Sequence, residues 1–119
     1  MRVKMEVNEK NGVSVVVLSG KLTIGEATAA LRNTIQGIVD GGARRILLNM
    51  ADVIYIDSSG LGELVAVRAT VARAGGDVKL LKLGKHAHDL LKITKLYTVF
   101  EVFEDEAAAI QSYSPEKAA

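Results

Sequence analysis

The chain has 119 residues, of which 49% are hydrophobic and 24% are charged. This length and balance predict one folded domain with an aliphatic core, and they exclude a largely disordered chain. The formal net charge of +1 provides no global field to hold a polyanion, so we expect no nucleic-acid partner.

The absence of cysteine excludes disulfides, thiolate catalysis and cysteine-ligated zinc. The first ten residues, MRVKMEVNEK, lack the continuous apolar run of a signal peptide, and no segment approaches the length of a membrane span. We therefore expect a cytoplasmic protein without membrane insertion.

The first twenty residues predict an antiparallel hairpin. Apolar and polar residues alternate over residues 3–8, as in a half-exposed strand, and residues 13–20 form a more continuously apolar strand. Asn11 and Gly12 lie between the two segments and favour a tight turn.

The next segment has a helical pattern. Apolar residues recur at three- and four-residue spacing over residues 27–39, which predicts a helix with one apolar stripe. Thr23 and Glu26 match the capping box, in which the threonine oxygen accepts from first-turn amides and the glutamate reaches back to the amide of the cap. A glycine pair beginning at Gly41 is expected to end the helix.

Strands and helices continue to alternate in the rest of the chain. The expected elements are a strand at residues 44–50, a helix that ends before Gly75, a strand at 77–83, a helix at 85–96, a strand at 99–103 and a helix within 104–113. This order predicts an α/β fold with a mixed, mostly parallel sheet and about four helices. We expect residues 1–112 to form the domain and residues 113–119 a frayed tail.

A basic stretch runs through the strand expected at 77–83 and the helix expected at 85–96. It consists of Lys79, Lys82, Lys85, Lys92 and Lys95. Because no aromatic residues are interleaved for base stacking, we expect these lysines to lie on solvated faces.

The sequence YIDSSGLGELV at residues 55–65 lies where a strand passes into a helix. Aspartate, serine and glycine favour a helix start, since a side-chain oxygen can accept from the free amides of the first turn. A cap alone does not require two adjacent serines followed by Gly-Leu-Gly.

Three chemical sites can be compared with this motif. A serine hydrolase elbow reads Gly-x-Ser-x-Gly, but neither Ser58 nor Ser59 has glycine two residues before it. His86 and His88 are the candidate bases, and because triads assemble from distant residues, a hydrolase stays open as a remote alternative. The chain lacks a nucleotide-binding Gly-x-x-x-x-Gly-Lys-Ser/Thr loop, and two histidines spaced by two on a helix point apart, so we expect no cofactor and no metal site.

The sequence YIDSSGLGEL resembles the Asp-Ser-Ser-Gly-Leu-Gly signature of the anti-sigma-factor antagonist family, which is built on the STAS domain. The similarity extends in order over VVVLSGKLT at residues 15–23, over residues 46–57 and over residues 90–110. The resemblance implies a single-domain STAS fold and a protein that acts by binding and is not an enzyme.

In that family the first serine after the aspartate is the phosphorylation site, which here is Ser58. The resemblance implies that the unphosphorylated chain binds an anti-sigma factor with serine kinase activity and so frees a sigma factor. Phosphorylation would separate the complex, and a metal-dependent serine phosphatase would reset it. The alternative is a stand-alone STAS subunit of a stress-sensing or lipid-transport assembly.

The residues around Ser58 are expected to bind the partner. They are Asp57, Ser59, Gly60, Leu61, Gly62, Glu63 and Thr23. Asp57 is expected to cap the helix and to contribute negative charge. Thr23 stands where the family carries an acid, which preserves capping and removes a carboxylate from the expected surface.

Overall fold

The computed structural model describes residues 3–113. Its elements are β1 (Lys4–Lys10), β2 (Val13–Leu22), α1 (Glu26–Asp40), β3 (Arg45–Ile56), α2 (Ser58–Arg73), β4 (Asp77–Leu81), α3 (Lys85–Thr94), the 3-10 turn η1 (Leu96–Thr98), β5 (Val102–Phe103) and α4 (Glu106–Gln111). The strands form a five-stranded sheet in the order β1-β2-β3-β4-β5, with β1 antiparallel and the other neighbours parallel. The predicted α/β fold with a mostly parallel sheet and four helices is confirmed.

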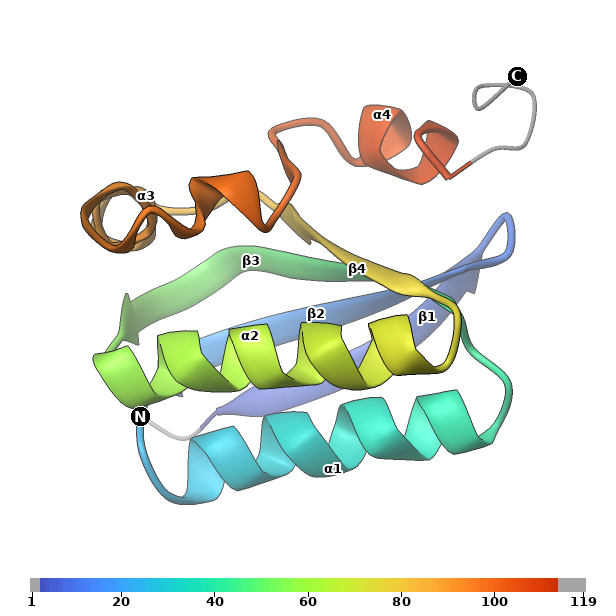
Figure 1. Cartoon of the computed structure of the whole chain (residues 1–119), viewed down its shortest axis with the longest axis horizontal. Coiled ribbons are helices and arrows are strands. Elements are labelled where there is room, and N and C mark those ends of the chain that lie inside the picture. Colours follow the sequence, from blue (N-terminus) through green and yellow to red (C-terminus); the bar gives the residue numbers. More distant parts are fainter. Residues whose placement is uncertain (1–2, 114–119) are drawn as a thin grey trace.

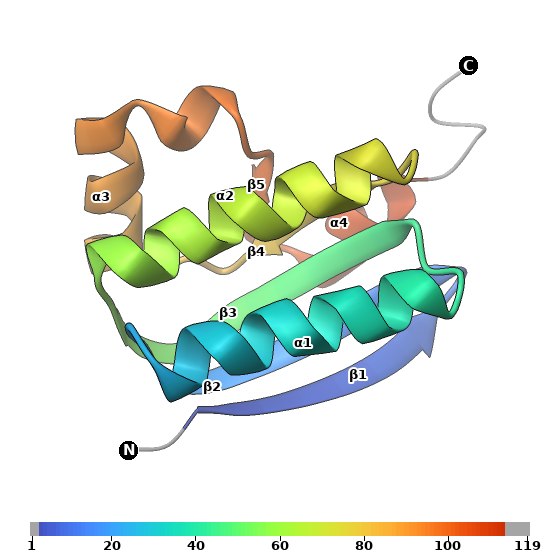
Figure 2. The ribbon, with the colours of Figure 1, turned by 60° about the horizontal axis from the view of Figure 1, so that its bottom comes forward.

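The helices cover the two faces of the sheet unequally. Each parallel connection advances by one strand in the same direction, and right-handed crossovers then place their helices on the same face. Helices α1 and α2 accordingly lie side by side along one face (Figures 1 and 2), and Leu91 of α3 belongs to the same hydrophobic core. The last helix, α4, packs Ala109 into a smaller core on the other face, against Val15 and Leu47. None of the helices within residues 3–113 is long and apolar enough to cross a membrane.

The predicted hairpin is confirmed at its turn. Lys10 pairs with Val13, and both intervening residues have positive φ, 52° at Asn11 and 79° at Gly12. Asparagine and glycine are the residues that adopt this conformation most readily, so the local sequence determines the turn.

The predicted cap of α1 is wrong. The helix begins at Glu26 with Gly25 as its N-cap, and the Thr28 hydroxyl accepts from the Gly25 amide at 3.2 Å and donates to the Gly25 carbonyl at 3.1 Å. Thr23 lies two residues before this cap: Gly25 has a non-helical φ of 106°, and the Ile24 amide between them donates to the carboxylate of Asp57.

The largest differences from the predicted strand boundaries are in β3 and β5. The strand expected at 44–50 continues to Ile56, because β2 pairs with it as far as Leu22↔Ile56, across two irregularities in the register. The strand expected at 99–103 is reduced to Val102 and Phe103, which pair with the end of β4.

Lys79 is buried, which corrects the expectation that it lies on a solvated face. Only 6% of the residue is exposed, because β4 is an interior strand and the chain after α4 crosses it. The Lys79 ammonium donates to the Ser112 hydroxyl at 2.7 Å and lies 4.2 Å from the ring centroid of Tyr113. The other lysines of the basic stretch are exposed, as predicted.

Tyr113, which the predicted division assigns to the frayed tail, is anchored to the sheet. Its hydroxyl lies 2.7 Å from the Ile46 carbonyl and 2.9 Å from the Asp77 carbonyl, and burial raises the pKa of the phenol. The rest of the predicted tail, residues 114–119, lies outside the described residues, so the boundary of the domain stays a prediction.

Candidate functional site

The serine motif lies at the carboxyl end of the parallel strands. Helices α1 and α2 both begin at this end of the molecule, at the left in Figure 1, where β3 also ends. Ser58 is the first residue of α2, as predicted, and is exposed. In α/β sheets this edge is where ligands usually bind, because loops from neighbouring strands converge there.

Asp57 ties two loops together at this edge. Its Oδ1 accepts from the Gly60 amide at 2.7 Å and so caps α2, as predicted, and its Oδ2 accepts from the Ile24 amide at 3.1 Å. The hydrogen bond from Gly60 is the main reason that the pKa of the Asp57 carboxyl lies below its usual value. The bond to Ile24 brings the loop that carries Thr23 beside Ser58.

The two glycines of the motif have different structural roles. A Cβ atom at Gly60 would lie 2.1 Å from the Leu22 carbonyl oxygen and 2.9 Å from Cγ1 of Ile56, so only glycine fits between the start of α2 and the end of β2. A Cβ atom at Gly62 would meet no atom within 4 Å. Gly60 is therefore structural, whereas Gly62 leaves open space on the helix surface.

The predicted docking residues do not all reach the surface. Gly60 and Leu61 are buried, so their assignment to an exposed docking surface is corrected. Glu63 exposes 10% of its side chain and pairs with Arg32 of α1 at 2.8 Å, so its carboxylate joins the two helices. Ser58 and Gly62 are exposed, and Ser59 and Thr23 are partly exposed.

Three exposed apolar residues near this edge were not predicted from the sequence. Ile24 is 74% exposed, Ile54 is 60% exposed and Tyr55 is 45% exposed. Ile24 adjoins the site through its bond to Asp57, and the other two lie at the end of β3, just before Asp57. The sequence signal for Ile54 and Tyr55 was the apolar run before Asp57, which lies beyond the strand expected at residues 44–50. Exposed apolar residues gathered at one edge are typical of an interaction surface.

His86 also lies at this edge, which the sequence analysis did not anticipate. Its Nε2 is 3.1 Å from the Ile56 carbonyl oxygen, and its ring stacks on Tyr55 with centroids 5.1 Å apart. The second histidine, His88, contacts Glu104 at 3.4 Å. Within residues 3–113, no hydrogen bond joins Ser58 to either histidine, and no three acidic or histidine side chains are grouped to hold a metal ion.

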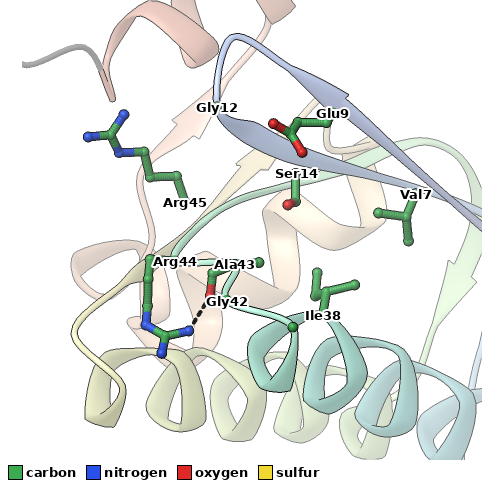
Figure 3. A pocket seen from close by; sticks show the side chains of 10 residues that line it. Val7, Glu9, Gly12, Ser14, Ile38, Gly42, Ala43, Arg44 and Arg45 are labelled. Atoms are coloured by element: carbon green, nitrogen blue, oxygen red, sulfur yellow. Dashed lines mark hydrogen bonds between the residues drawn. The ribbon is translucent and has the colours of Figure 1, made fainter.

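A hollow of about 640 Å³ lies at the opposite end of the sheet, between the β1–β2 hairpin and the end of α1. Figure 3 shows Arg44 and Arg45 beside it, with their guanidinium groups pointing away from each other and from Glu9. The Arg44 guanidinium donates to the carbonyls of Val39 and Ala43 at 3.0 and 2.8 Å, so it caps α1. Because a ligand site needs polar groups that converge, we assign no site to this hollow despite its size.

Comparison with known proteins identifies the family. Residues 4–109 match the family model of the STAS domain. The chain is 26% identical over 111 residues to the anti-sigma-B factor antagonist of Bacillus subtilis. The aligned region covers 93% of this chain and 100% of that protein.

Solved structures show the same fold. An anti-sigma factor antagonist from Mycobacterium paratuberculosis has a TM-score of 0.79 at 24% identity, over 93% of each chain. The Bacillus cell fate determinant SpoIIAA in its phosphorylated form has a TM-score of 0.71 at 21% identity, over 91% of this chain and 97% of that one. Because the family model spans most of the described residues and the fold agrees, this chain belongs to the STAS domain family.

Proposed function

We propose that this protein is an anti-sigma factor antagonist that is switched by phosphorylation of Ser58. The unphosphorylated form binds an anti-sigma factor that is also a serine kinase, and a sigma factor is released. Phosphorylation ends this binding, and a metal-dependent serine phosphatase restores it. The observation that carries the proposal is the exposed Ser58 at the start of α2, with exposed apolar residues on the neighbouring loop, at Ile24, and at the end of β3, at Ile54 and Tyr55. The names of the similar proteins support the same partner class.

The position of Ser58 allows the domain to accept a phosphate without unfolding. The first turn of a helix has free amides and a positive dipole end, and both favour an anion. Ser58 is exposed, so the phosphate can remain hydrated. The similarity of this fold to a relative described in its phosphorylated form is consistent with this expectation.

The same position would make phosphorylation disrupt a complex. A phosphate adds about −1.5 to −2 charges at neutral pH. Asp57 already places a carboxylate at the start of α2, so the edge becomes strongly acidic. A partner packed on Ile24, Ile54 and Tyr55 would have to desolvate this charge, which weakens binding.

The residues of the motif divide into two groups in this proposal. Ser59, Gly62 and Thr23 contact the partner beside Ser58, together with the exposed apolar residues Ile24, Ile54 and Tyr55. The other group consists of Asp57, Gly60, Leu61 and Glu63, which stabilise the structure of this surface. Asp57 caps α2, and Gly60 allows α2 to approach β2 closely. Leu61 packs in the core, and Glu63 pairs with Arg32 of α1. In this proposal the ATP site belongs to the partner kinase and the metal site to the partner phosphatase. We place this cycle in the cytoplasm.

Binding to a purified anti-sigma factor kinase, with and without ATP, tests the proposal. Wild-type protein should bind and then dissociate when ATP is added, whereas Ser58→Ala should remain bound. Ser58→Asp should bind at least about 10-fold more weakly, since it places a permanent charge on the surface. Thr70→Ala removes a hydroxyl near the other end of α2, away from the proposed contact residues, and is the matched control that should behave like the wild type.

Three results would contradict the proposal. The first is phosphate mapped by mass spectrometry to Ser59 alone. The second is tight binding by Ser58→Asp that does not change when ATP is added, which would favour a STAS subunit of another assembly. The third is labelling of Ser58 by a fluorophosphonate probe, which would indicate a serine hydrolase.

A further inference from the structure

The end of β3 that leads to Ser58 has a strand on one side only. Pairing between β3 and β4 stops at Asn49↔Leu81, whereas pairing between β3 and β2 continues to Leu22↔Ile56. Residues 50–56 therefore extend beyond β4. Strand carbonyls on an unpaired side need another donor, either from water or from a side chain.

The first turn of α3 covers this unpaired side incompletely. A cavity of about 120 Å³ lies between residues 50–56 and the start of α3, lined by Met50, Val53, Ala87 and neighbouring residues. Packing between the extension and α3 is therefore incomplete at this cavity, although Val53 and Ala87 both pack against the hydrophobic core. The contacts made by His86 bridge this gap.

His86 makes two contacts with the extension. A carbonyl oxygen can only accept, so Nε2 of His86 carries the proton and donates to the Ile56 carbonyl across 3.1 Å. The imidazole also lies nearly parallel to the ring of Tyr55, with 15° between the planes. These contacts come from a residue 30 positions away in the sequence.

The peptide that His86 contacts is held on both sides. Its carbonyl belongs to Ile56 and accepts from His86, and its N–H belongs to Asp57 and donates to the Leu22 carbonyl across 3.3 Å. Because a peptide unit is planar, the two bonds together set its orientation. Asp57 follows at once and caps the helix that Ser58 begins, so this orientation sets the backbone from which the Ser58 side chain projects.

We propose that His86 is a positioning residue for Ser58: it fixes the Ile56–Asp57 peptide and, with Tyr55, pre-organises the edge that a kinase partner would recognise. The effect on the partner rests on the proposed function, whereas the ordering of the edge does not. Loss of the histidine lowers the fraction of molecules in the binding-competent shape, and the apparent affinity falls by the same factor.

Hydrogen exchange of three amides tests the structural part. The amides of Ile24, Asp57 and Gly60 report the bonds around the turn. In His86→Ala their exchange should rise by about 3- to 10-fold, the effect of one lost hydrogen bond, while core amides keep their rates. His86→Gln retains an N–H donor and should restore most of the protection.

His88→Ala is the matched control, because His88 lies on the same helix and contacts Glu104 rather than β3. This variant should leave the three amides unchanged. Unchanged exchange in His86→Ala, or equal exchange in the alanine and glutamine variants, would overturn the proposal. An equal increase in His88→Ala would also overturn it, because the effect would then be a general loosening of α3.

Phosphorylation kinetics test the consequence for Ser58. With a purified anti-sigma factor kinase and ATP, His86→Ala should raise KM by about 3- to 10-fold and leave kcat within about twofold, since pre-organisation acts on binding. An unchanged KM alongside faster exchange would overturn the positioning role. Failure of the kinase to modify wild-type Ser58 would instead overturn the proposed function, while the exchange data would still decide whether His86 orders the edge.

Discussion

Replacement of Gly60 by alanine is expected to destabilise the domain, whereas the same replacement at Gly62 should stabilise it. Both glycines lie in the first turns of α2, two residues apart in the same motif. They differ in what an added methyl group would meet. At Gly60 it would lie 2.1 Å from a backbone oxygen of β2, and at Gly62 it would meet nothing within 4 Å.

The magnitude follows from the atom that is contacted. The oxygen belongs to Leu22, whose partner in β3 is Ile56, so it cannot move away without disturbing the end of the sheet. Overpacking costs about 1–3 kcal/mol, and an immovable neighbour places Gly60→Ala near the upper end. Alanine is favoured over glycine inside a helix by about 1 kcal/mol. We therefore expect a net loss of about 2 kcal/mol for Gly60→Ala and a gain of about 0.5–1 kcal/mol for Gly62→Ala.

Urea and thermal denaturation measure both changes in the free energy of unfolding. For a domain of this size, about 1 kcal/mol shifts Tm by roughly 4 °C, so Gly60→Ala should lower Tm by about 8 °C and Gly62→Ala should raise it by a few degrees. A stability of Gly60→Ala equal to that of the wild type would refute the argument that α2 needs glycine to approach β2.

Two further predictions concern the cap and the C-terminal anchor. The folded-state pKa of Asp57 is depressed, so its carboxylate contributes stability above the unfolded pKa of about 4, and this contribution is lost as the pH falls through the folded pKa. Urea titrations of the wild type and of Asp57→Asn at pH 7 and pH 3 should therefore show that the free energy of unfolding falls further in the wild type as the pH is lowered. An equal fall in both proteins would contradict the assignment of this pH dependence to Asp57. Tyr113→Phe removes the hydroxyl beside the carbonyls of Ile46 and Asp77 and should cost about 1–2 kcal/mol of unfolding free energy. Tyr97→Phe, at an exposed tyrosine, is its control and should cost much less; equal stabilities of the two variants would mean that the anchor contributes nothing.

The parts of the fold that were predicted correctly depend on residues close together in the sequence. The hairpin turn follows from Asn11 and Gly12, which themselves adopt the positive φ values that the turn needs. The cap at Asp57 is equally local, because its carboxylate reaches an amide three residues ahead. The order of strands and helices follows from hydrophobic periodicity, which needs no knowledge of the partner segments.

The cap of α1 shows where local reasoning fails. Thr23 and Glu26 match the capping box, yet the helix begins after Gly25, and the loop before it is tied to the start of α2 by the bond from the Ile24 amide to Asp57. That bond joins residues 33 positions apart. A sequence pattern cannot weigh a local cap against a hydrogen bond whose partner is brought near only by sheet pairing.

For the candidate site, the sequence by itself placed Ser58 at a helix start and identified Asp57 as the cap, and the structure adds that Ser58 is the exposed first residue of α2. Tertiary structure alone decided that Gly60 faces the Leu22 carbonyl, that Glu63 pairs with Arg32, and that His86 reaches the peptide before Asp57. The physical reason is the same in each case. Capping needs only the neighbouring backbone, whereas close approach, ion pairing and burial depend on which distant segments the sheet brings together.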